Sequence, residues 1–477
     1  MELKMQNIKA LRIFSARTIL IFDIFLLAIM FCFSEILLED ELEHLHATYL
    51  ITQGLVPFRD FFEHHNPLLW GLLAPIITFL PQNTILIIYV TRLLMAVFST
   101  GTIYYIYKIA YSFFGGKTCA ILSILIYLSF YPSIYMFFTI KPDTLLYFFF
   151  IFGLYYFLLY MQTLQAKPLI ICTFALTLSF LFLQTAVFMI IPVAIIALCF
   201  LYKNPLQYKN YLRSIPIPML LCGSFILYLY LTDSIQEYFQ LCWLLNSKFY
   251  SLLDYKISNM VLPFIPYILL SISAYFYLVL TKKDNIYIRT VALIFFFSIL
   301  KNIIYPTFSP HYLVPSFLCA SLLLGSVLKN LRFPGFKIVK IALFTLFFTN
   351  TIIIICTHHH WYNMRTLNSI KPQDTSLSYN KYKIRNIYQA ERHYYWFIHE
   401  IEAIDNYLFN RKPNYNLTKI VNEEKFKYIF YKKESNILLK NSTDEKLKKI
   451  YRQHMLDAEI LNDYYMEVNG NYILKNM

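Results

Sequence analysis

Charged residues are scarce in this chain of 477 residues: Asp, Glu, Lys and Arg make up 15%, against 58% hydrophobic residues. The mean hydropathy of +0.50 is higher than a soluble domain of this length shows. Long runs of Ile, Leu, Phe and Tyr are typical of membrane spans. The scarcity of charge therefore excludes a soluble globular protein and favours a polytopic membrane protein.

Other features are missing too. No small-residue cleavage site follows the first apolar run, residues 18–38, so we interpret it as an uncleaved first helix. The net charge is +14, but no basic face with interleaved aromatic residues is present, which excludes a nucleic-acid partner. The eight cysteines fall nearly all in apolar segments, where small core residues are expected rather than disulfides or ligands.

The apolar runs predict about eleven transmembrane helices. Residues 168–202 would extend about 52 Å as one helix, whereas a bilayer core is about 30 Å thick, so two short spans meeting near Gln184 are expected. The Pro-bounded stretch 67–82 is too short to cross, so we expect it to lie at the outer interface or to re-enter. The predicted spans are 18–38, 84–107, 118–138, 143–162, 168–184, 186–202, 216–232, 259–281, 290–305, 311–329 and 337–356.

The charges of the predicted loops indicate how the protein is oriented in the membrane. With a cytoplasmic N-terminus, seventeen basic residues lie in cytoplasmic loops and five outside, as the positive-inside rule requires. We therefore expect an all-α polytopic membrane domain over 1–356, with a first outer loop at 39–83. Residues 357–477 are more polar and predict a small extracytoplasmic α/β domain, with FKYIFYK and NYILK as strands and residues 442–457 as a helix.

The first outer loop concentrates acids and histidines. Of the fourteen acids in residues 1–356, six lie between residues 39 and 63, and four of the eleven histidines lie there or close by. A hydrated loop is the ordinary explanation, but charge beside a membrane is costly, about 2.5–3.5 kcal/mol near a helix centre, which favours a function. Apolar residues at helical spacing predict a short amphipathic helix that opens at Asp40 and Glu41 and lies on the membrane.

Several short motifs follow one another along the chain: Asp40-Glu41, the segment GLVPFRDFF from Gly54, the turn His64-His65-Asn66-Pro67, Arg92 in the second span, Lys141-Pro142-Asp143 and Pro310-His311-Tyr312. In this order they resemble the first outer loop and later spans of GT-C type polytopic membrane glycosyltransferases. The similarity is greatest to family 39 protein O-mannosyltransferases and lipid A aminoarabinose transferases.

The resemblance implies an inverting transfer of sugar from a polyprenyl-phosphate donor to a hydroxyl of a lipid, glycan or protein acceptor, outside the cytoplasmic membrane. It implies Asp40 as the general base, with a pKa raised by burial or by Glu41 beside it, and Asp143 as a second functional carboxylate. The candidate ligands of the donor phosphate are Arg92, Lys141, His311 and, more loosely, Lys301; the candidate cavity residues are Asp60, His64 and His65.

Plainer roles stay open for several of these residues. Asp143 could cap a helix, Arg92 could form a structural ion pair with an acid such as Asp40, and His311 could hydrogen-bond at the interface. We assign no metal ligands and no certain cofactor. A divalent cation at Asp40, His64 and His65 is kept as an alternative, although adjacent histidines seldom bind one ion.

Two other classes of function are weighed. A transporter or flippase for a lipid-linked or anionic solute would favour ionisable residues deep in spans and broken helices. Here the charges gather in outer loops, and Arg92 is the clearest exception. A receptor or assembly protein would depend on an informative tail and a dispensable first loop, and the sequence shows the reverse.

Overall fold

The computed structural model describes residues 36–37, 39–247, 264–283, 285–304 and 310–330, together with short pieces between 342 and 474. Two of the predicted spans, 18–38 and 337–356, lie almost entirely outside these residues. The predicted helix at 442–457 also lies outside them.

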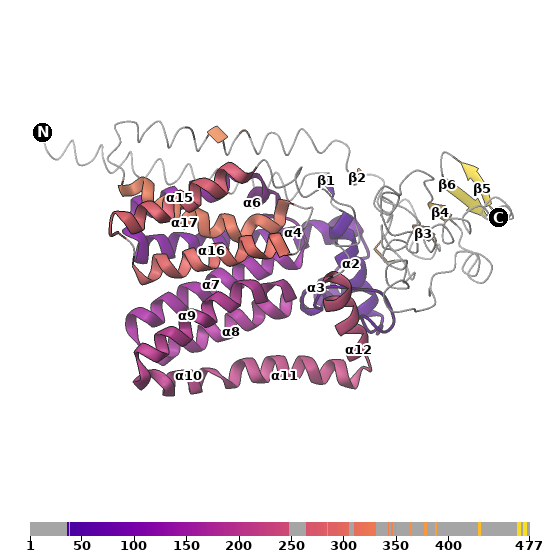
Figure 1. The fold of residues 1–477 in the computed structure, drawn as a ribbon. Coiled ribbons are helices and arrows are strands. Elements are labelled where there is room, and N and C mark those ends of the chain that lie inside the picture. The colour runs from indigo at the N-terminus through magenta and orange to yellow at the C-terminus, as the bar shows by residue number, and fades with distance from the viewer. Residues whose placement is uncertain are drawn as a thin grey trace, which may run out of the picture.

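Helices run side by side through most of the described chain (Figure 1). Each of the nine predicted spans within it coincides with one helix or with two in succession, and five helical segments are long and apolar enough to cross a membrane. The exact number of eleven spans stays a prediction. The helices are α4 (Thr84–Ile109), α5 (Lys117–Ser129), α6 (Tyr131–Tyr135), α7 (Pro142–Thr163), α8 (Ala166–Phe182), α9 (Val187–Lys203), α10 (Tyr208–Ser214), α11 (Pro216–Leu231), α15 (Ile265–Leu280), α16 (Ile286–Ile304) and α17 (Val314–Asn330).

The predicted division near Gln184 is present. Helix α8 ends before Leu183, whose extended backbone (φ −152°, ψ 125°) breaks the helical hydrogen-bond ladder. A short 3₁₀ turn, Gln184–Ala186, then leads into α9. Both helices contact α7, so the chain reverses direction here instead of continuing as one long helix.

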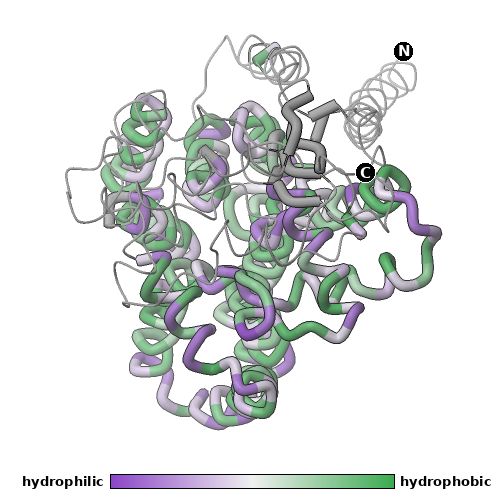
Figure 2. Tube along the Cα trace, turned by 90° about the vertical axis from the view of Figure 1, so that its right-hand side faces the viewer, coloured by the Kyte–Doolittle hydropathy of each residue, from purple (hydrophilic) through white to green (hydrophobic). Residues whose placement is uncertain are grey.

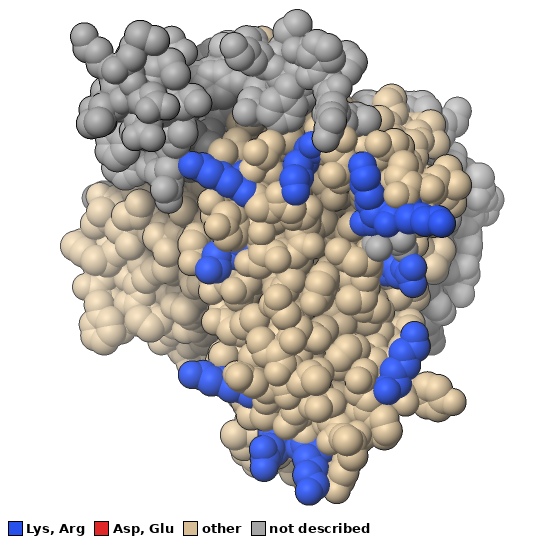
Figure 3. Space-filling model, turned by 90° about the vertical axis from the view of Figure 1, so that its left-hand side faces the viewer, with Lys and Arg blue, Asp and Glu red and all other residues tan. Residues whose placement is uncertain are grey.

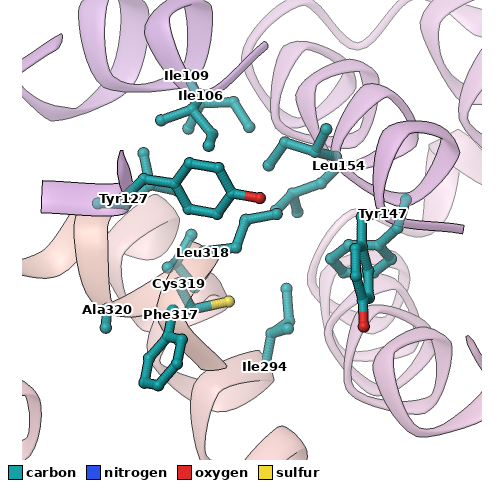
Figure 4. Close-up of a cluster of buried hydrophobic side chains, with 14 of the residues drawn as sticks. Ile106, Ile109, Tyr127, Tyr147, Leu154, Ile294, Phe317, Leu318, Cys319 and Ala320 are labelled. Atoms are coloured by element: carbon teal, nitrogen blue, oxygen red, sulfur yellow. The ribbon is translucent and has the colours of Figure 1, made fainter. Parts of the chain in front are cut away.

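The centre of the bundle is filled by α17, which is buried along its length from Val314 to Val327. Figure 4 shows Phe317, Leu318 and Cys319 of this helix among side chains of α4, α5, α7 and α16. Helices α5 and α17 approach closely because position 325 is Gly: a Cβ there would collide with the Ser123 side chain. Small residues at such contacts are what helix packing in lipid requires.

The outer surface of the bundle is apolar. Helix α11 exposes Met219, Leu220 and Leu231 to about 70% each, and α9 and α15 carry similar side chains. A soluble protein seldom exposes continuous apolar surface on this scale, whereas lipid tails solvate it. The surface therefore confirms a multi-pass membrane protein.

Short elements gather at one end of the bundle: α2 (Glu39–Thr52), α3 (Leu68–Phe79) and α12 (Ile235–Tyr238) (Figure 1). Seen from that end, hydrophilic segments lie mainly in the connections, and the bundle helices are largely hydrophobic (Figure 2). Helix α3 has 12 residues, fewer than the roughly 20 that a span needs, and it packs against α2.

The prediction of an amphipathic surface helix at α2 was wrong in one respect. The helix forms where expected, but every side chain from Glu41 to Thr48 is buried, polar ones included. The acids and histidines from Glu41 to His46 find their partners inside the protein, so this stretch of α2 has no solvated polar face.

Charge is segregated between the two ends of the bundle. The nine acids described in residues 36–330 lie in α2, the α2–α3 connection, the start of α7 and the α11–α12 region. The opposite end shows Lys and Arg and, among the residues drawn there as described, no Asp or Glu (Figure 3). The exposed basic residues in or beside the connections α4–α5, α7–α8, α9–α11 and α15–α16 and near the end of α17 are Lys117, Lys167, Lys203, Lys209, Arg213, Lys282, Lys283, Arg289 and Lys329.

The described residues of the C-terminal part include short strands, one of which pairs with a strand near the N-terminus. β1 (Ile36–Leu37) pairs antiparallel with β2 (Tyr362–Asn363). A second sheet has the order β3 (Ser376–Ser378), β4 (Tyr428–Phe430), β6 (Asn471–Leu474), β5 (Tyr465–Val468). The segments predicted as strands, FKYIFYK and NYILK, contain β4 and β6, which are antiparallel neighbours. The α/β domain as a whole stays a prediction.

Candidate active site

A buried ion pair joins α2 to α4. The Arg92 guanidinium donates from Nε to Glu41 Oε1 at 2.8 Å and from Nη2 to Glu41 Oε2 at 2.6 Å. The backbone N–H of Ile140 also donates to Oε1, at 3.3 Å. Both charged side chains are at least 96% buried, so each depends on the other for compensation. The structural partner considered for Arg92 was Asp40; the structure pairs it with Glu41.

Asp40 pairs instead with Lys141, the residue just before α7. Burial alone would raise the pKa of the Asp40 carboxyl, but the attraction and hydrogen bond of Lys141 outweigh it and hold that pKa below its usual value. The expectation of a raised pKa was therefore wrong, because a cation and not a second carboxylate is the nearest partner. Asp40 is ionised at neutral pH, and the stability that this ionisation contributes is lost as the pH falls through the lowered pKa.

Asp143 lies in the first turn of α7, where a negative charge suits the helix dipole. It is buried, and the Tyr147 hydroxyl faces both its Oδ1, at 3.3 Å, and the backbone carbonyl of His311, at 3.1 Å. Lys301 is within electrostatic range of Asp143, and its Nζ lies 4.8 Å from the centre of the Tyr312 ring. Three segments distant in sequence thus meet here.

Asp40 with Lys141, and Asp143 with Tyr147 and Lys301, belong to one polar cluster. His311 is within electrostatic range of Asp40, Lys141 and Lys301, and His65 is within range of Asp40. Hence α2, the α2–α3 connection, the start of α7, the end of α16 and the 3₁₀ turn Pro310–Leu313 before α17 contribute to a single site at the α2 end. Such a site could bind an anionic group through its lysines and accept a proton at Asp40.

The turn His64-His65-Asn66 is held by its backbone and by Asn66. Asn66 Nδ2 donates to the Phe180 carbonyl at 2.7 Å, and its Oδ1 accepts from the Tyr238 hydroxyl at 2.9 Å. The His64 carbonyl accepts from the side chains of Gln184 and Asn246, at 2.9 and 3.0 Å. The turn is therefore fixed to the ends of α8 and α9 and to the region after α12.

Asp60 has a local role in the structure. Its carboxylate accepts from Arg59 Nε and Nη2, each at 2.9 Å, and from the backbone N–H of Val56 at 2.8 Å. Arg59 in turn donates to the carbonyl of Thr232 at 3.1 Å. These bonds hold the connection against the end of α11.

The histidines divide into two groups. Burial is the main cause that holds the pKa values of His44 and His64 well below the usual value, so both imidazoles are neutral at pH 7. His65 Nδ1 faces Glu63 and Glu43, and together with His44 these groups could hold a metal ion. His64 is outside this group of described residues.

Sequence reasoning missed several polar residues of this site. Glu43 and Glu63 were counted as acids of the loop, yet their full burial singles them out. Tyr147 follows Asp143 by four residues, a helical spacing that could have indicated the contact. Asn302, next to Lys301, is buried with no hydrogen-bond partner for its amide among the described residues, and nothing in the sequence marks it.

Comparison with known proteins now adds to this geometry. Residues 65–234 match the model of the Dolichyl-phosphate-mannose-protein mannosyltransferase family. No curated protein matches the sequence. The chain is similar to ArnT from Cupriavidus metallidurans bound to undecaprenyl phosphate, with a TM-score of 0.56, 11% identity, and coverage of 80% of this chain and 85% of that one. The apo state of the same ArnT gives a TM-score of 0.58 and 10% identity over 86% of this chain and 91% of that one.

The predicted resemblance is confirmed by two independent likenesses. The structural similarity to ArnT, at such low sequence identity, concerns the fold. The match to the family model concerns residues 65–234, which run from His65 to the turn before α12. The chain therefore has the ArnT fold and carries, in its N-terminal half, the sequence pattern of the GT-C mannosyltransferase family.

Proposed function

We propose that this protein is an inverting glycosyltransferase that moves a sugar from a polyprenyl-phosphate donor to a hydroxyl acceptor. The observation that supports it most is the juxtaposition of Asp40 and Lys141 beside the group Asp143, Lys301 and His311. A proton acceptor next to a set of cations is what this reaction needs, because a hydroxyl must lose its proton while a phosphate leaves with developing negative charge. The similar ArnT was crystallised with undecaprenyl phosphate, which supports a lipid-linked donor of that kind.

In this proposal Lys141 has two competing partners. It pairs with Asp40 in the structure, and a donor phosphate would attract it as well. If Lys141 paired with the phosphate instead, the Asp40 carboxylate would lose its cationic partner. The pKa of Asp40 would then rise toward the usual range, and Asp40 would be a stronger base. Asp143 and Lys301 would orient the donor, and Glu41 would act through Arg92 by fixing the start of α2.

The orientation is part of the proposal. The basic end of the bundle would face the cytoplasm and the α2 end the opposite side of the inner membrane, in accordance with the positive-inside rule. The N-terminus would then be cytoplasmic, and residues 357–477 would be extracytoplasmic. A transporter is less well supported, because the described acids gather at one end of the bundle and do not line a path through it.

The test is a transfer assay with purified protein, polyprenyl-phosphate sugars and candidate acceptors. We expect Asp40→Asn to reduce transfer by about 10²–10⁴-fold, the usual contribution of a general base. Asp233→Asn is the matched control, because it makes the same change in an exposed acid at the same end of the bundle.

If the Asp40→Asn variant transferred sugar at the wild-type rate, Asp40 would not be the general base. Absence of transfer to every acceptor, together with solute flux into proteoliposomes, would favour the transporter.

A further inference from the structure

The amide side chain of Asn302 is buried near the end of α16. Asn302 is 8% exposed, and neither its Nδ2 nor its Oδ1 has a hydrogen-bond partner. Among the described residues it is the one side chain with two buried polar atoms left unpaired. Native proteins pair almost all such groups, because burial without a hydrogen bond is costly. An amide left unpaired on both sides therefore indicates a partner from outside the chain.

Asn302 continues the face of α16 that packs inside the bundle. Phe295, Ser298 and Asn302 are buried and follow one another at intervals of three and four residues, which places them on one side of the helix. One turn before Asn302, the Ser298 hydroxyl lies 2.8 Å from the Ser316 hydroxyl of α17. The amide therefore lies on the interior side of α16.

At this end of α16, the neighbouring residues belong to the polar cluster. Helix α16 contacts the turn Pro310–Leu313 as well as α17. Lys301, the residue before Asn302, has its Nζ 4.8 Å from the centre of the Tyr312 ring and lies within electrostatic range of Asp143. Asn302 is thus next to the residues that orient the donor in the proposed function.

We propose that Asn302 binds hydroxyl groups of the donor sugar, an inference that rests on the proposed function. A primary amide offers a hydrogen-bond donor at Nδ2 and an acceptor at Oδ1, and a hydroxyl group can accept as well as donate. Neighbouring hydroxyls of one sugar ring could therefore pair both amide atoms at once. Because a buried polar group left unpaired penalises a ligand that lacks the matching hydroxyl, Asn302 would help to determine which sugar is accepted.

The other parts of the donor fit this amide less well. Phosphate oxygens act as hydrogen-bond acceptors, so they would pair Nδ2 and leave Oδ1 without a partner. The prenyl chain has no polar atoms and would pair neither. The sugar is the part of the donor whose chemistry matches both sides of the Asn302 amide.

The experiment compares binding of undecaprenyl phosphate with binding of the same lipid bearing mannose, glucose, galactose or 4-aminoarabinose. Dissociation constants come from the rise in the midpoint of thermal unfolding with lipid concentration, in detergent. We expect one of the sugars to bind the wild type more tightly than the bare lipid phosphate. Asn302→Leu and Asn302→Ala should weaken binding of that sugar-bearing lipid about 10-fold, by loss of its hydrogen bonds, and leave binding of undecaprenyl phosphate within about 2-fold of the wild type.

Binding of undecaprenyl phosphate also shows that each variant is folded. Asn330→Leu is the matched control, because it makes the same change near the end of α17, at the opposite end of the bundle, where Asn330 Nδ2 donates to the Ser326 carbonyl. It should bind both lipids as the wild type does. In the transfer assay, Asn302→Leu should raise KM for the sugar donor and leave KM for the acceptor unchanged.

The proposal is overturned if no sugar binds the wild type more tightly than the bare lipid phosphate, or if the Asn302 variants weaken both lipids equally or neither. A raised KM for the acceptor alone would assign the amide to the acceptor and would also overturn it. Failure of the wild type to bind undecaprenyl phosphate at all would count against the proposed function itself. If the wild type binds that lipid and the preference for a sugar does not depend on Asn302, the role of Asn302 fails while the proposed function stands.

Discussion

At the scale of single residues, the role of each charged side chain depends on the residue with which it forms an ion pair. Asp40 and Glu41 are adjacent in sequence, yet the first pairs with Lys141 and the second with Arg92. The Glu41–Arg92 pair is bidentate and fully buried, a geometry that fixes position. The Asp40–Lys141 pair is more accessible, because about a third of the Asp40 side chain is exposed. Of the two pairs, the one with the partly exposed Asp40 is therefore better placed to exchange partners.

The buried pair gives a prediction about stability. Glu41→Gln or Arg92→Met leaves one buried charge without compensation, which typically costs about 3–5 kcal/mol, so the midpoint of thermal unfolding in detergent should fall markedly. The double variant should lose much less than the sum of the two single changes. A normal unfolding midpoint in Arg92→Met combined with loss of transfer would instead mean that Arg92 acts on the donor phosphate.

At the scale of elements, α2 and the turn after it are held by hydrogen bonds to distant helices. Asn66 is central, since it bonds both to the end of α8 and to α12. The C-terminal part also contacts α2: His46 Nδ1 lies 2.8 Å from the carbonyl of Ile387, and the rings of Tyr49 and Tyr388 meet edge to face. The site helix is thus positioned from several sides.

Asn66→Ala should loosen this turn without harming the bundle. It leaves the Phe180 carbonyl and the Tyr238 hydroxyl without their partner, at about 1–3 kcal/mol for each buried group. Hydrogen exchange should quicken over residues 61–67 and stay slow in α5 and α17. Gln53→Ala is the control, because the Gln53 bond to Thr52 is exposed and 3.4 Å long. Unchanged exchange in Asn66→Ala would show that the turn is held by other contacts.

At the scale of the whole molecule, charge segregation predicts the orientation in the membrane. With a membrane-impermeant thiol reagent, Asp233→Cys should label in intact spheroplasts, and Lys282→Cys only after the membrane is opened. Both positions are exposed and lie in connections at opposite ends of the bundle. A wild-type control is required, since Cys199 is exposed on α9. The reverse labelling pattern would invert the proposed topology.

The sequence by itself determined the membrane class, the positions of the helices and most residues of the polar cluster. Hydrophobic runs place α4 to α17 because each span must satisfy its backbone within lipid, which leaves helices as the local solution. Even the division at Gln184 follows from the thickness of a bilayer. The resemblance carried by short motifs then pointed to Asp40, Lys141, Asp143, Lys301 and His311, which the structure brings together.

Only the tertiary structure decided which charges meet. The pairing of Glu41 with Arg92, the lowered pKa of Asp40 and the convergence of Glu43, Glu63 and His65 depend on distances between separate segments. The burial of the polar side of α2 likewise follows from partners supplied by α3, α4 and the connection. Local sequence fixes helices through hydrogen bonds within each segment, whereas electrostatic partners are chosen by packing across the molecule.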